Sequence, residues 1–410
     1  MKRGFYIILA AQFFSALADN ALLFAAIALL MQLDAPGWQQ PVLNQFFVFS
    51  YIALAPFVGP FADSLPKGKV MFISNAVKSA GCLAMLIGMH PFYAYGIVGI
   101  GAAMYSPAKY GILTEYLPPQ KLVLANGWME GLTVAAIILG AILGSLLVNA
   151  GIANHFLELL DIPGIETGIN TPPEFAISVI LGLYVTAAVF NLYIPKVALD
   201  HKLPKTNVFY ILSDFWHCFK LLWRDPLGQV SLAVTTLFWG VGATLRLIIL
   251  AWAAVALNFG LEKATQLTAV VALGIAAGSV IAAKFVKLEK SVRILPVGIA
   301  MGLSLMLIVF ISDLHIAIVM LLTIGAFSGF FIVPMNALLQ HRGHLLMGAG
   351  HSIAVQNFNE NLSILAMLGV YAILVRLGIS VSTVIIIFGL FICAVMAYLY
   401  RRHAQDKVET

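Results

Sequence analysis

The chain alternates long apolar stretches with short polar gaps. Each stretch holds roughly 20 residues, the length that an α-helix needs to cross about 30 Å of hydrocarbon. Six stretches precede a polar segment near 196–227 and six follow it. They cover residues 5–31, 42–62, 70–89, 92–113, 124–150, 174–195, 228–257, 266–284, 292–312, 315–339, 348–376 and 380–400. The pattern predicts an all-α polytopic membrane protein with twelve transmembrane helices.

A common offset of 227 positions relates residues of the two sets. It joins Asp19 to Arg246, Pro107 to Pro334, and Glu130 to Asn357. The offset predicts two pseudo-symmetric six-helix bundles. We expect an N-terminal half at 1–195, a cytoplasmic linker with an amphipathic helix at 196–227, and a C-terminal half at 228–410.

The composition supports this class of protein. The 410 residues are 61% hydrophobic and only 10% charged, with a mean hydropathy of +0.97. Soluble domains carry about 25% charged residues. The net charge of +5 and the pI near 9.0 do not indicate nucleic acid, because the basic residues lie in the gaps between apolar stretches. The three cysteines are scattered without metal-ligand spacing, and neither a metal nor a cofactor is expected.

Basic residues also predict the orientation. With the N-terminus inside, the inner gaps and ends hold 18 Lys and Arg residues, and the outer ones hold only Lys263 and Arg376. Such an excess is typical of cytoplasmic loops. Residues 1–18 resemble a cleaved signal sequence, but the apolar run continues to Met31, so we expect an uncleaved first span. Both termini are predicted to be cytoplasmic. In the linker, Asp214, His217 and Lys220 lie on one side of an apolar segment, which indicates a helix at the inner membrane surface.

Charged residues inside the apolar stretches are the candidate functional residues. The acids are Asp19, Glu130 and Glu360, and the bases are Lys78, Lys109 and Arg246. A charge at the bilayer centre costs about 2.5–3.5 kcal/mol on insertion scales, so it marks a functional site by default. Further polar residues share faces with these acids, and we expect the faces to line a water-filled cavity between the halves. For a single Ser or Asn, helix–helix bridging is the simpler interpretation, and Lys109 lies close enough to a helix end to extend into the interface.

The segment after the second span contains a different motif. Gly59, Asp63, Lys67 and Lys69 resemble the loop 2–3 signature of the major facilitator superfamily, in which an acid and basic residues latch the two halves on the cytoplasmic side. Ser64 stands where the family commonly has Arg. The second-half counterpart has Ala282 at the position of the acid, so one latch is expected.

Several strings are similar to those of bacterial lysophospholipid transporters. They are ADNALLFAAIALL (18–30), YSPAKYGIL (105–113), ANG-x-ME (125–130), LFWG…LR (237–246), VPMNALLQ (333–340) and AVQN-x-x-EN (354–361). The resemblance implies a major facilitator fold and alternating access. It also implies transport of lysophosphatidylethanolamine-type lipids to the cytoplasmic leaflet of the inner membrane, where an acyltransferase (acyl-carrier-protein synthetase) remakes the diacyl lipid.

A lysophosphatidylethanolamine head carries a phosphate and an ammonium. The expected substrate-binding residues are Asp19, Asn20, Lys109, Glu130, Arg246, Asn357 and Glu360. Arg246 can bind phosphate with two hydrogen bonds and Lys109 can assist it. Either Asp19 or Glu360 can accept the ammonium. The expected partners are the lipid substrate and the bilayer, the expected state is a monomer, and no catalytic residues are expected.

Other functions remain open from the sequence. The buried acids equally suit a proton-coupled major facilitator for another solute or drug. A membrane acyltransferase is disfavoured because no His is followed by Asp after four intervening residues. An ATP-driven pump is disfavoured because the GxxxxGK[ST] loop is missing. A passive scramblase or a receptor is compatible with the sequence.

Overall fold

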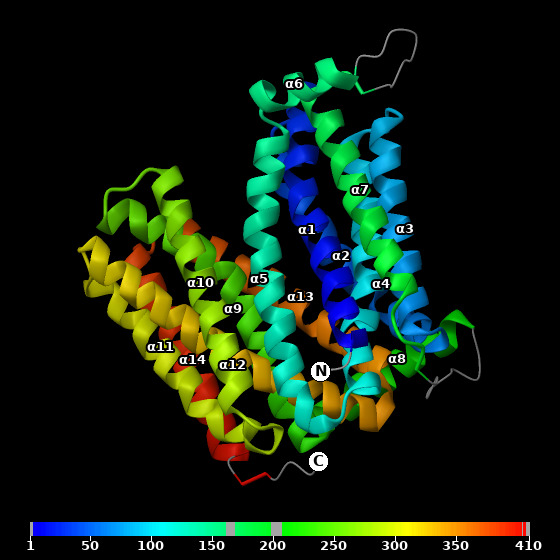
Figure 1. Ribbon diagram of the computed structural model, residues 1–410. Helices are drawn as coiled ribbons and strands as arrows, with labels where there is room; N and C mark the ends of the chain where they lie inside the picture. Colours follow the sequence, from blue (N-terminus) through cyan, green and yellow to red (C-terminus); the bar gives the residue numbers. More distant parts are fainter. Residues whose placement is uncertain (1–2, 161–168, 198–206, 404, 407–410) are drawn as a thin grey trace. The chain divides into compact units, whose positions relative to one another are not determined.

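The computed structural model describes residues 3–160, 169–197, 207–403 and 405–406. Among these residues the structure contains helices and no strands (Figure 1). The helices of the first half are α1 (Arg3–Gln32), α2 (Gln39–Ser64), α3 (Lys67–Leu86), α4 (Pro91–Tyr116), α5 (Leu122–Leu147), α6 (Ala150–Leu160) and α7 (Pro172–Leu192). They are followed by α8 (Val208–Arg224), α9 (Pro226–Ala256), α10 (Leu261–Phe285), α11 (Leu295–Leu307), α12 (Leu314–Met347), α13 (Ala349–Arg376) and α14 (Val381–His403).

The predicted membrane spans correspond to observed helices. Eleven helical segments are long and apolar enough to cross a membrane by length and composition, within the described part of the chain. The long helix outside that set is α4, in which glycines, tyrosines and Lys109 lower the hydropathy. The span predicted at 292–312 is a composite, because 3-10 turns at Leu288–Ile294 and Ile308–Phe310 extend the short α11 at both ends. The all-α, twelve-helix fold class is confirmed.

Two helices lie outside the predicted spans. Helix α8 lies within 196–227, where the sequence predicts an amphipathic linker helix, and it exposes Phe209 and Trp216. Helix α6 lies in the gap between the fifth and sixth spans, where no helix was expected. It contacts α7, and the rings of Phe156 and Phe175 stack with their centroids 5.6 Å apart.

The chain forms two compact units. The first comprises Met1–Ile112, Ala135–Leu212 and Ala349–Ala354, and the second comprises Leu113–Val134, Ser213–Gly348 and Val355–Thr410. The units follow the two halves of the sequence with two exceptions: Leu113–Val134, which includes the first half of α5, belongs to the second unit, and Ala349–Ala354 of α13 belongs to the first. The boundary between the units near the middle of the sequence falls within α8. The proposed boundaries at 195 and 228 remain a prediction.

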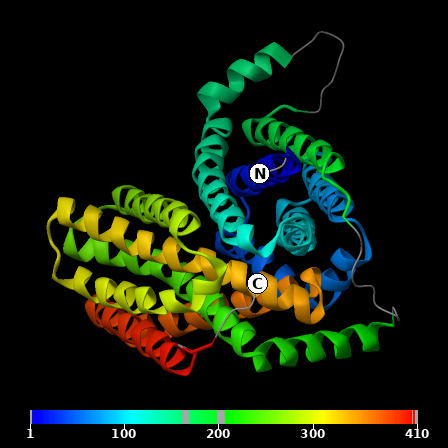
Figure 2. The same cartoon turned by 60° about the horizontal axis from the view of Figure 1, so that its bottom comes forward.

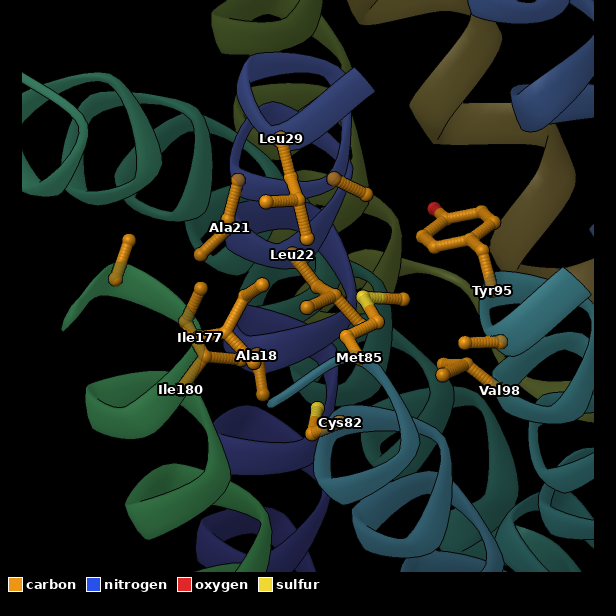
Figure 3. Close-up of a cluster of buried hydrophobic side chains, with 14 of the residues drawn as sticks. Ala18, Ala21, Leu22, Leu29, Cys82, Met85, Tyr95, Val98, Ile177 and Ile180 are labelled. Carbon is orange, nitrogen blue, oxygen red and sulfur yellow. The ribbon is translucent and has the colours of Figure 1, made fainter. Parts of the chain in front are cut away.

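The core of the first unit lies where α1, α3 and α7 pack together. Figure 3 shows Leu22 of α1 beside Met85 of α3, with Ala18, Ala21 and Cys82 in the same cluster. Residues Ile177 and Ile180 of α7, and Tyr95 and Val98 of α4, complete the labelled cluster. Alanines on α1 allow close approach of the neighbouring helices, as small residues do in membrane proteins.

In the second unit, α10 and α12 form the most extensive helix pair (Figure 2). Glycines permit their contact: a Cβ atom at Gly278 would collide with the carbonyl oxygen of Ala326, and one at Gly329 with that of Ile275. Helix α14 packs on α11 and α9. At the start of α9, Asp225 accepts a hydrogen bond from the Gly228 amide (2.8 Å) and two from Arg342 of α12 (2.6 and 3.1 Å). This bidentate ion pair fixes the N-terminus of α9 against α12.

Candidate functional site

Asp19 of α1 forms an ion pair with Lys78 of α3 in the first unit. The Lys78 ammonium lies 2.8 Å from Asp19 Oδ2, and the Tyr184 hydroxyl of α7 donates to Oδ1 at 2.8 Å. Lys78 is 1% exposed, whereas Asp19 retains 21%. A buried lysine needs a partner of this kind to remain charged. The pair therefore neutralises Lys78 and leaves one side of the Asp19 carboxylate accessible.

The surroundings hold this pair in one geometry. Lys78 donates to Ser15 Oγ (3.1 Å), which donates to Asn75 Oδ1 (2.8 Å). The Lys78 ammonium also lies 4.8 Å from the centre of the Tyr105 ring, within cation–π range. Gly101 of α4 makes room for the lysine stem, because a Cβ atom there would lie 2.7 Å from Lys78 Cγ.

Asn20, the neighbour of Asp19, contacts α1 itself and lies close to α5. Its side-chain amide donates to the Ala16 carbonyl at 2.8 Å, one turn back on α1. Its Cβ atom faces Gly140 of α5, where a Cβ atom would lie only 2.7 Å away. The structure thus places Asn20 at a close α1–α5 contact.

In the second unit, Glu130 and Glu360 belong to one buried amide network. Asn336 of α12 donates to Glu130 Oε1 at 3.3 Å. Gln356 of α13 donates to Asn336 Oδ1 (3.0 Å) and to Glu360 Oε1 (2.7 Å). One turn away, Asn126 of α5 and Gln340 of α12 exchange two hydrogen bonds of 2.8 Å. The network joins α5, α12 and α13 through polar side chains.

Two further residues of the predicted set lie in different units: Asn357 in the second and Lys109 in the first. Asn357 is buried on α13, and its carbonyl accepts from Asn361 at 2.8 Å. Lys109, in the first unit, is half-buried, and its ammonium lies 4.6 Å from the centre of the Tyr110 ring. The structure therefore brings Glu130 and Glu360 together and places Asp19 with Lys78.

Arg246 is the exposed cation of α9. Its side chain has no ion pair or hydrogen bond among the described residues. The flanking residues Leu245, Leu247 and Ile248 are apolar. A guanidinium in an apolar helix requires an anion or water, since a lipid chain offers it no acceptor. Arg246 is therefore available for an anionic ligand.

The latch motif surrounds the N-terminus of α13. Asp63 Oδ1 accepts from the amide of Gly350 (2.8 Å), and Oδ2 accepts from the amide of His351 (3.0 Å) and lies 2.6 Å from its Nδ1. The Lys67 ammonium lies 2.6 Å from Asp63 Oδ1 and donates to the Ala62 carbonyl. A carboxylate at a helix N-terminus satisfies amides that have no partner within the helix and favours the helix dipole.

Small residues make this contact close. A Cβ atom at Gly59 would lie 3.0 Å from His351 Cα, and one at Gly350 would lie 2.6 Å from Asp63 Oδ1. Lys69, by contrast, is exposed and has no ion pair among the described residues. The structure groups Gly59, Asp63 and Lys67 and leaves Lys69 apart.

Sequence reasoning missed several partners. The sequence identifies Lys78 as a base inside an apolar stretch, but the predicted substrate-binding set does not include it. The contact of His351 with Asp63 joins residues 288 positions apart, a separation that no local sequence pattern reveals. Tyr184 carries no sequence signal, because tyrosine is common in membrane spans.

Comparisons with known proteins agree with the fold. The family model described as Major Facilitator Superfamily matches residues 8–362. The chain resembles solved transporters over nearly its full length. One is FucP in the outward conformation, with a TM-score of 0.76 and 13% sequence identity over 99% of each chain. Another is a bacterial homologue of the iron transporter ferroportin in an outward-facing state. Its TM-score is 0.74 and its sequence identity 14%, over 99% of this chain and 100% of that chain.

Curated relatives are much more similar in sequence. The protein named lysophospholipid transporter LplT of Yersinia enterocolitica is 43% identical over 93% of this chain and 89% of its own length. The protein of the same name from Yersinia pestis is 42% identical over 94% of this chain and 90% of its own length. At this identity and coverage, the chain belongs to the lysophospholipid transporter family of the major facilitator superfamily.

Proposed function

We propose that this protein transports lysophospholipids of the lysophosphatidylethanolamine type to the cytoplasmic leaflet of the bacterial inner membrane by alternating access. The observation that carries the substrate site is Arg246, a guanidinium without a partner among the described residues in an apolar helix. It suits the phosphate, the one anionic group that the head of such a lipid presents.

Asp19 is the better of the two candidates for the ammonium. It is 21% exposed, and its contacts with Lys78 and Tyr184 fix the orientation of its carboxylate. Glu360 is 7% exposed and already accepts from Gln356. In this proposal Lys109 assists phosphate binding, and Glu130, Asn357 and Glu360 shape the polar wall of the pathway.

The contact of Asp63 with the start of α13 suits a conformational latch on the cytoplasmic side. It joins α2, from the N-terminal half of the sequence, to α13, from the C-terminal half. Breaking and remaking this contact would accompany each transport cycle. We further propose a monomer that delivers its lipid to an acyltransferase (acyl-carrier-protein synthetase), with both termini cytoplasmic.

Uptake of labelled lysophosphatidylethanolamine into spheroplasts tests the substrate site. Arg246→Ala should lower uptake at least tenfold, because a hydrogen bond to a charged group is worth about 1.5–3 kcal/mol. Arg246→Lys should retain part of the uptake, since it keeps the charge but loses the bidentate geometry. Arg376→Ala, which removes an exposed arginine at the end of α13, is the matched control. Undiminished uptake by Arg246→Ala would contradict the assignment.

A second candidate is proton-coupled transport of another solute. It is favoured by Glu360, a buried acid that receives its hydrogen bond from an amide and has no ion pair among the described residues. An uncoupler separates the two functions. Uptake that collapses with the uncoupler, together with no competition from lysolipid, would support the second candidate.

A further inference from the structure

A pocket of about 580 Å³ lies where α3 begins and α7 ends, within the first unit. The two helix ends meet closely, because a Cβ atom at Gly68 would lie 2.8 Å from the Asn191 carbonyl oxygen and 3.0 Å from Ile194 Cβ. Lys69 and Lys196 line the pocket together with apolar residues such as Phe72 and Ile194.

The charges of the pocket favour an anion. Lys69 and Lys196 are both exposed, neither has an ion pair among the described residues, and the lining contains no acid. The N-terminus of α3 also lies at the pocket. The backbone amides at a helix N-terminus attract negative charge. Lys67, the other basic residue of that turn, is already neutralised by Asp63.

Asn191 supplies an independent observation. It lines the pocket and is 1% exposed, yet neither the nitrogen nor the oxygen of its side-chain amide has a hydrogen-bond partner in the structure. Buried amides without partners are rare in folded proteins and call for an explanation. The Asn191 nitrogen is enclosed in this conformation, so its side chain must turn for a ligand oxygen in the pocket to accept from it.

We infer that this pocket binds a phosphate group, presented by an anionic phospholipid of the surrounding leaflet. Two lysines, a helix N-terminus and one amide donor suit phosphate oxygens, and the apolar lining suits the glycerol and the first methylenes that follow the phosphate. The site uses none of the residues assigned to the transported lipid. The inference therefore stands whatever substrate the protein carries.

Lipid binding to the purified protein in non-ionic detergent tests this site. Native mass spectrometry and thermal unfolding are measured with phosphatidylglycerol, with phosphatidylcholine and with inorganic phosphate. Phosphatidylglycerol should bind and raise the unfolding temperature, and phosphatidylcholine should bind more weakly because its head is neutral overall. Stabilisation by inorganic phosphate alone, lost in Lys196→Gln, would support the phosphate site and identify a soluble ligand in place of a lipid.

The variants distinguish a built site from general attraction to a basic surface. Lys196→Gln and Asn191→Leu should each lower the affinity for phosphatidylglycerol about tenfold. Lys290→Gln removes another exposed lysine, one outside the pocket, and should leave the affinity unchanged. Lys196 is on the surface, so its replacement tests binding without endangering the fold. An equal loss in Lys290→Gln, or unchanged affinity in both pocket variants, would overturn the inference.

Discussion

At the residue scale, the ion pair of Asp19 and Lys78 changes how the first span is understood. A lone carboxylate in an apolar helix would be an open binding group. Asp19 instead holds a lysine that is 1% exposed, and it offers only its remaining exposed side to a ligand. A lipid ammonium would therefore compete with Lys78 for the carboxylate, and binding could loosen the contact between α1 and α3.

Removing the lysine should be costly. Lys78→Ala leaves the carboxylate of Asp19 without its cation, and breaking a buried pair in this way costs about 3–5 kcal/mol. We expect the lower end of that range, because Asp19 is 21% exposed. The double variant Asp19→Asn with Lys78→Ala should regain much of the lost stability, since it leaves no unpaired charge.

Thermal unfolding of Lys78→Ala, Asp19→Asn and the double variant, each purified, measures this cycle. Lys284→Ala, at an exposed position near the end of α10, serves as the control. Additive losses in the double variant would show that the two charges do not stabilise each other.

The sequence predicted which residues carry charge inside the membrane, but it did not predict their partners. Charge counting favours neutral pairs, and Asp19 with Lys78 is one. Arg246 forms none among the described residues. Pairing depends on how each helix is rotated about its axis, and a 26- to 31-residue apolar helix such as α2 or α9 has little amphipathic pattern to reveal that rotation.

At the scale of elements, α13 depends on a contact from outside its own sequence. Its first residue follows Gly348, whose φ of +96° favours glycine, and its first amides bind Asp63 of α2. The motif around Gly59 and Asp63 was therefore recognisable in the sequence, but the structure was needed to show that its target is the start of α13.

Gly350→Ala should break this contact. Its Cβ atom would lie 2.6 Å from Asp63 Oδ1 and 2.7 Å from the Gly59 carbonyl oxygen, so the acid must move away. We expect transport to fall several-fold and stability to drop by about 1–2 kcal/mol, the usual cost of losing a helix cap. Uptake and thermal unfolding measure the two effects.

Gly369→Ala provides the matched control on the same helix. A Cβ atom there meets nothing within 4 Å, and alanine favours a helix over glycine by about 1 kcal/mol in water. The control should therefore be as stable as the parent protein or slightly more so. If both variants behaved alike, the contact with Asp63 would have no energetic importance.

Elements that lack a long apolar run were the hardest to predict. Helix α6 has 11 residues and lies between two predicted spans, where the hydropathy pattern predicts no helix. The short α11 has only 13 residues of regular α-helix, because 3-10 turns complete its span. The hydropathy pattern shows how far an apolar stretch extends along the chain. It does not show whether the backbone within that stretch forms α-helical or 3-10 hydrogen bonds.

At the scale of the whole molecule, the distribution of basic residues predicts the orientation in the membrane. Helix α10 offers a direct test of this orientation, because it has a lysine near each end. Lys263 lies in its first turn, and Lys290 follows its C-terminus. A helix of 25 residues is about 37 Å long, enough to place these two lysines on opposite sides of the bilayer.

Single cysteines at these two positions report the orientation. In a background in which Cys82, Cys218 and Cys393 are replaced by alanine, Lys263→Cys should react with a membrane-impermeant maleimide in intact spheroplasts. Lys290→Cys should react only after the membrane is permeabilised.

The reverse pattern would place both termini outside, and it would reverse the direction in which a latch at Asp63 could control access. Labelling of both positions in intact spheroplasts would show that α10 does not cross the bilayer, contrary to the twelve-span fold. The orientation therefore determines which leaflet the pocket at Lys69 and Lys196 faces, and so which lipids are available to it.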